Sequence, residues 1–174
     1  MLTSELSVID QILSLHRNKI AGNYAPHKPV LLLAVADLFE DGSLHSNRIE
    51  LTDHLKDAFY ANWKQFVGHS LFFKPTVTKP FWHMGNEPFW ELRSITDKPV
   101  DMSIPVYSEG KLRSNYYVVI DEMLRTMLAD KDCRALIRHC ISSCYFADNK
   151  KASLPGSQST LLSLIVPVLL SIAS

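Results

Sequence analysis

The sequence has no excess of charge of either sign: its 174 residues include 18 Lys and Arg and 18 Asp and Glu. A protein that binds nucleic acid over its whole surface is usually basic, so any such surface here has to be a local patch. Cysteine is also scarce, and Cys133, Cys140 and Cys144 all lie in one late segment. This odd number indicates reduced thiols in a cytoplasmic protein rather than a disulfide framework.

Long hydrophobic runs and glycine-rich loops are missing as well. The stretch closest to a membrane span, residues 161–173, is interrupted by Pro167. A membrane-spanning helix needs about 20 apolar residues, so we expect no membrane contact. The sequence also contains no glycine-rich loop that would cradle a phosphate and no nucleophile elbow. We therefore expect neither a cofactor nor a metal ion.

The most informative segment is Ala-Pro-His-Lys-Pro at residues 25–29, which leads directly into an apolar run at 30–39. Pro29 fits the first position of a helix, because it has no N–H and its φ is already helical. A helix that is apolar on all sides belongs in a buried core. The sequence therefore places His27 and Lys28 at the N-terminus of a central helix, where the dipole favours an anion such as phosphate.

Hydrophobic periodicity predicts a mainly helical α+β domain over residues 1–147. Helices are expected at 4–21, 29–41, 114–128 and 130–146, together with one that Thr52 caps and Gly68 ends. A short strand is expected at 48–51 and an aromatic-rich hairpin at 81–92, and this order resembles a winged helix. Residues 148–174 have the composition of a linker and an apolar tail, as in the truncated end of a longer protein.

Several of these segments together resemble one protein family. They are the run YAPHKPVLLLAVADLFEDG, the later IEL, the pair KPFWHM and PFWEL, and the closing ISSCYF. Over residues 5–147 the chain is similar to the N-terminal domain of bacterial HNH-type restriction endonucleases related to the McrA enzymes. That family includes sulfur-binding domains that recognise phosphorothioate-modified DNA. The resemblance implies a module that reads double-stranded DNA without the nuclease domain that cuts it.

The resemblance also implies particular binding residues. In the sulfur-binding relatives, the modified linkage lies on a small apolar surface around a proline, and basic residues hold the neighbouring phosphates. His27 and Lys28 match the basic pair, and Pro80 matches the proline. A further cation is expected from Lys111 or Arg113.

Two further positions in this predicted site depart from the relatives. Lys79 precedes Pro80 where the relatives carry an aromatic residue, and His83 stands where a small residue leaves room. Sulfur in a phosphorothioate is large and poorly hydrated, so an apolar surface removes it from water at less cost than a phosphate oxygen. We include Lys79 and His83 among the expected DNA-binding residues.

One alternative function is a Mg²⁺-dependent nuclease. The order Pro99, Asp101, Glu109 and Lys111 loosely follows nucleases in which two carboxylates hold Mg²⁺ and a lysine assists the attacking water. That motif needs its Glu-x-Lys segment on a rigid strand, whereas Gly110 indicates a turn here.

A second alternative is a protein-interaction adaptor that does not bind DNA. The predicted hairpin with Trp82, Phe89 and Trp90, or the apolar tail, would then form the contact surface. The three rings would otherwise stack on exposed bases, although at least half of them are expected in the core. The partner would be a second copy of the chain or a separately encoded nuclease. Neutral net charge agrees with this alternative.

Overall fold

The computed structural model describes residues 2–147. The linker and apolar tail predicted at residues 148–174 lie outside the described residues. The longer helices are α1 (Leu2–Leu13), α2 (His27–Glu40), α3 (Asp53–Phe66), α6 (Glu122–Ala129) and α7 (Lys131–Phe146). The shorter ones are α4 (Thr78–His83), the 3-10 turn η1 (Met84–Asn86) and α5 (Glu109–Asn115).

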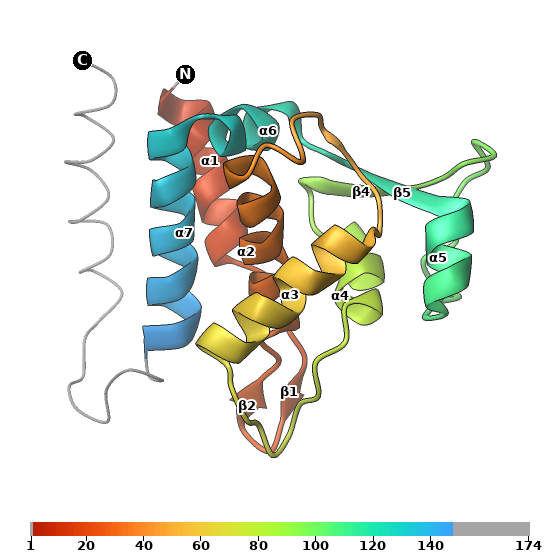
Figure 1. The fold of residues 1–174 in the computed structure, drawn as a ribbon, viewed down its shortest axis with the longest axis horizontal. Helices are drawn as coiled ribbons and strands as arrows, with labels where there is room; N and C mark the ends of the chain where they lie inside the picture. Colours follow the sequence, from red (N-terminus) through yellow and green to blue (C-terminus); the bar gives the residue numbers. More distant parts are fainter. Residues whose placement is uncertain (1, 148–174) are drawn as a thin grey trace.

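Helix α2 forms the centre of the fold, as its composition predicts. Ten of its residues, from Pro29 to Phe39, are buried. The helix packs against α3, α4, α6 and α7, and α1 packs against α6 and α7 (Figure 1). Helix α2 therefore holds its first turn in a fixed place relative to the elements around it.

Two small antiparallel sheets accompany the helices. Strand β5 (Tyr116–Ile120) is the centre of the larger sheet, between β3 (Arg48–Ile49) and β4 (Trp90–Ser94). The smaller sheet is a hairpin of β1 (Lys19–Ile20) and β2 (Asn23–Tyr24). The fold class is therefore α+β with small antiparallel sheets, in agreement with the sequence.

Several predicted element boundaries are wrong. Helix α1 ends at Leu13, and of the remaining residues of the predicted 4–21 helix only Lys19–Ile20 form a regular element, β1. Helix α2 begins at His27, so Pro29 is its third residue rather than its first. The missing N–H still costs nothing there, because the first turn of a helix leaves its N–H groups without helical partners.

The predicted aromatic hairpin at 81–92 does not exist. Residues 81–86 continue α4 and η1, and β4 pairs with the distant β5 instead. Residues 116–120, predicted to be helical, form that β5 partner strand. Without the hairpin, the structure does not confirm the winged-helix resemblance.

Candidate functional site

A pocket of about 650 Å³ opens beside the first turn of α2. It also involves the β1–β2 hairpin, the loop between α3 and α4, and α4 itself. Its cationic and imidazole side chains are those of Arg17, Lys28, Lys74, Lys79, His16, His27 and His83. No Asp or Glu is among the described residues that line it. In a chain of zero net charge, this pocket concentrates positive charge.

His27 lines the pocket but does not act as a cation. Its ring lies 4.8 Å from the Trp63 ring and 5.9 Å from the Phe73 ring, measured between centroids. Burial lowers the pKa of His27, which keeps the ring neutral at pH 7. Since a carbonyl can only accept, Nε2–H donates to the Lys74 carbonyl at 2.9 Å. His27 therefore offers the pocket a neutral ring rather than the charge that the sequence led us to expect, and its contact ties a loop to α2.

Lys28 is already paired with a carboxylate. Its ammonium donates a hydrogen bond to Oε1 of Glu87, whose side chain is only 1% exposed. The same carboxylate accepts a hydrogen bond from the His16 backbone N–H at 3.1 Å. Glu87 therefore balances the charge of Lys28, contrary to the expectation of an ammonium available for phosphate.

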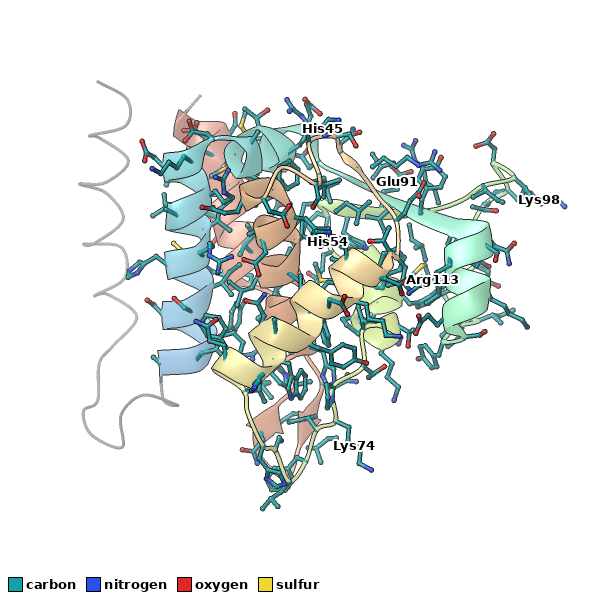
Figure 2. The ribbon with its side chains drawn as sticks, viewed as in Figure 1. His45, His54, Lys74, Glu91, Lys98 and Arg113 are labelled. Atoms are coloured by element: carbon teal, nitrogen blue, oxygen red, sulfur yellow. The ribbon has the colours of Figure 1, made fainter. Side chains whose placement is uncertain are left out.

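The cations left for an anion in this pocket are Arg17, Lys74 and Lys79. None of the three forms an ion pair with any residue that the structure describes. The Arg17 guanidinium lies 4.8 Å from the Tyr24 ring and 4.4 Å from the Tyr145 ring, so aromatic faces hold it without neutralising it. Lys74 is exposed at the end of the molecule that carries the hairpin (Figure 2).

Pro80 and His83 lie on α4, and both line the pocket. Pro80 is buried as the third residue of α4, so its ring contributes an apolar wall. Nε2 of His83 lies 2.6 Å from the Tyr107 hydroxyl. The pKa of His83 is lowered by burial and then by the nearby charges of Lys28 and Lys79. Tyr107 also lines the pocket, and no sequence signal predicts it because it comes from an irregular loop.

Lys111 and Arg113 are not part of this pocket. Both lie on α5, which Figure 2 places away from the Lys74 end of the molecule. The Arg113 guanidinium is engaged by the carboxylates of Asp53 and Glu109. Its role is to hold α5 against α3, and the expectation of a further phosphate cation from this position is not supported.

The residues of the nuclease alternative are also engaged elsewhere. Glu109 accepts hydrogen bonds from Lys56 at 2.9 and 3.1 Å and from Arg113 at 2.7 Å. Asp101 accepts from the Ser103 N–H and hydroxyl at 2.9 and 2.6 Å. Gly110 is helical, so Glu109 and Lys111 lie on neither the strand that the motif requires nor the predicted turn. Within residues 2–147, no group of three His, Cys, Asp or Glu side chains is placed to hold a metal ion.

The aromatic residues considered for base stacking or partner binding lie in the core. Trp82, Phe89 and Trp90 are each 1% exposed. The Trp90 indole N–H donates to the Phe81 carbonyl at 3.2 Å, which satisfies its polar atom inside the protein. These three rings therefore offer no surface to DNA or to a partner protein.

Two of the three cysteines have the features of core residues, whereas Cys144 is exposed. Cys133 and Cys140 are buried, and all three cysteines are free thiols. Burial raises the pKa of Cys133 and of Cys140 to about 11, so both stay protonated at neutral pH.

Among the described helices, none combines the length and apolar character that crossing a bilayer requires. The sequence matches no protein-family model and no curated protein.

Proposed function

We propose that this chain binds double-stranded DNA through the basic pocket, as the recognition module of a restriction-type endonuclease. The observation that carries the proposal is the charge of the pocket: a neutral protein gathers Arg17, Lys74 and Lys79 around one hollow. No carboxylate among the described lining residues opposes them. Phosphate contacts supply much of the affinity of proteins for DNA, and such contacts come mainly from Arg and Lys.

The first turn of α2 adds to this attraction. No side chain caps α2, so the N–H groups of His27 and Lys28 have no capping acceptor. Both residues line the pocket. An uncapped helix N-terminus carries a partial positive charge that favours a phosphate.

The apolar wall of the pocket supports a preference for a modified backbone. Pro80 and the rings of Phe72 and Phe73 line the same hollow as Lys74 and Lys79. Cations beside an apolar surface suit an anion whose charge lies partly on a poorly hydrated sulfur. We therefore propose phosphorothioate DNA as the preferred ligand and an unmodified phosphate linkage as the weaker one.

Binding to matched duplexes tests this function. Fluorescence anisotropy would compare one sequence in unmodified, phosphorothioate and methylated form at two salt concentrations. We expect salt-dependent binding of all three and tighter binding of the phosphorothioate. Each lost phosphate contact lowers the salt slope by about 0.9, so Lys74→Ala with Lys79→Ala lowers it by about 1.8 if each lysine holds one phosphate.

Lys98→Ala is the matched control for the loss of charge. Lys98 is exposed and lies at the far side of the molecule from Lys74 (Figure 2). We expect this variant, and Lys111→Ala on α5, to bind as the wild type does. Absence of duplex binding by the wild-type protein would refute the function, and equal salt slopes in all variants would refute the site.

A further inference from the structure

Four large apolar side chains are exposed on the two segments beside the pocket, the β1–β2 hairpin and the α3–α4 loop. They are Ile20 at 49%, Tyr24 at 53%, Leu71 at 85% and Phe72 at 44%, and we call them the apolar tip. Ile20 and Phe72 line the same pocket, so the β1–β2 hairpin and the α3–α4 loop meet there. Figure 1 shows both segments at one end of the molecule. A cluster of this kind, unlike a single exposed leucine, marks a binding surface.

The loop that carries Leu71 and Phe72 is held in place. The Ser70 hydroxyl accepts hydrogen bonds from the N–H groups of Phe72 and Phe73 at 3.3 and 3.1 Å. The Lys74 carbonyl accepts from His27, and the Phe73 ring packs edge-on against the same imidazole. Leu71 is therefore presented outward by a fixed turn, and little ordering of the loop has to accompany binding.

Cations flank the apolar tip. The Lys19 ammonium lies 4.9 Å from the Tyr24 ring, and the Arg17 guanidinium lies on the same ring. Lys74 follows the tip by two residues, and none of these three side chains forms an ion pair with a described residue. The ligand that fits has an anionic exterior and an apolar interior. Duplex DNA has both, in its phosphates and its stacked bases.

We infer that Leu71 and Phe72 insert between stacked base pairs, while Arg17, Lys19 and Lys74 hold the flanking phosphates. Apolar wedges of Leu and Phe unstack base steps and bend DNA in this way. The inference rests on the proposed function, because it gives the same pocket a second mode of contact. It predicts that this chain deforms the duplex that it binds.

The test uses a duplex with 2-aminopurine in its binding site and fluorophores at its two ends. We expect the wild-type protein to raise the 2-aminopurine fluorescence, which reports unstacking, and to increase energy transfer between the ends, which reports bending. Leu71→Ser and Phe72→Ser should abolish both signals and weaken binding about tenfold each. That loss corresponds to about 1.4 kcal/mol. Ile95→Ser is the matched control, since Ile95 is 52% exposed and does not line the pocket.

The outcomes separate this inference from the function on which it rests. If the wild type binds the duplex but Leu71→Ser leaves affinity and fluorescence unchanged, the wedge is refuted and the DNA-binding function stands. If the wild type does not bind duplex DNA, both are refuted. Vesicles of anionic phospholipid form a second arm: binding to them through Leu71, without binding to DNA, overturns the inference in favour of a membrane ligand.

Discussion

The pairing of Lys28 with Glu87 decides what Lys28 contributes. Glu87 is one of three polar or charged residues that are buried within residues 2–147, and Lys28 is its cationic partner, with a side chain 11% exposed. Removal of one partner from a buried ion pair leaves an uncompensated charge in the interior. The main role of Lys28 is therefore to stabilise the fold beneath the pocket.

We predict that Lys28→Ala lowers the free energy of unfolding by about 3 kcal/mol, measured by urea denaturation. The double variant Lys28→Met with Glu87→Gln should lose less stability than Lys28→Ala, because it removes both charges together. Lys74→Ala is the control, and it should change stability by less than about 0.5 kcal/mol because Lys74 is exposed. Equal stability of Lys28→Ala and the wild type would contradict the role assigned to this pair.

Burial of His27 makes stability depend on pH. Its pKa in the folded protein is lowered, so the unfolded chain takes up this proton first as the pH falls. The contribution of His27 to stability is therefore complete above the unfolded pKa of about 6.5, and it is lost as the pH falls from there to the folded value. We predict that His27→Gln loses less stability than the wild type between pH 7 and pH 5, as measured by urea denaturation at each pH. An identical pH profile for the two proteins would show that His27 titrates normally.

The sequence predicted part of the candidate site and missed its charge balance. The order Pro-His-Lys-Pro correctly placed His27 and Lys28 at the start of a core helix, because helix-start signals act locally. It did not reveal Glu87, which follows Lys28 by 59 residues and meets it only in the folded chain. Residue type alone therefore suggested two cations where the structure has a neutral ring and a paired ammonium.

Among the helices, α3 has the start that its sequence predicts. The Thr52 hydroxyl accepts a hydrogen bond from the Leu55 N–H at 3.1 Å. We predict that Thr52→Ala lowers the free energy of unfolding by about 1 kcal/mol, as measured by urea denaturation. Thr52→Ser should keep most of the wild-type stability, because its hydroxyl can still accept this hydrogen bond. If both substitutions cost the same, the hydroxyl is not the stabilising group.

A helix or strand can be predicted from the sequence when the residues that determine it lie within that segment. Helices α2, α3 and α7 lie close to their predicted positions because periodicity and capping signals lie within each segment. Strand β5 was mistaken for helix because its partners are distant: Trp90 pairs with Ile120, and Arg48 with Val119. Residues 81–83 were mistaken for strand because aromatic side chains favour strands, although burial in α4 satisfies them equally well.

For the molecule as a whole, zero net charge conceals an uneven distribution. The sequence suggested that any nucleic-acid surface would be local, and the pocket brings Arg17, Lys74 and Lys79 together with no Asp or Glu among its described lining residues. The carboxylates of Asp53 and Glu109 are instead engaged with Arg113, and Asp37 with Arg138. Separation of this kind lets a neutral protein attract an anion to one place.

Acidification should strengthen DNA binding if the pocket is the site. Because the pKa of His83 is lowered, the ring is largely neutral at pH 7.5. It gains a proton as the pH falls toward its own lowered pKa. A bound phosphate favours the protonated ring. We predict that the affinity for unmodified duplex rises between pH 7.5 and pH 5.5, as measured by anisotropy, and that His83→Gln reduces the rise.

His45→Gln is the control for that experiment. His45 is exposed and lies at the opposite end of the molecule from Lys74 (Figure 2). A rise in affinity that is the same in the wild type and in both histidine variants would assign the pH effect to general charge rather than to the pocket.

The Ser70 turn has a consequence for hydrogen exchange. The amides of Phe72 and Phe73 both donate to the Ser70 hydroxyl, although Phe72 lies on the surface. Surface loops usually exchange their amide protons freely with water, whereas these two should be protected until the turn itself opens. Because the His27 imidazole secures the same segment through Lys74, His27→Gln should shorten the lifetime of that protection at residues 72 and 73 without altering it in α7.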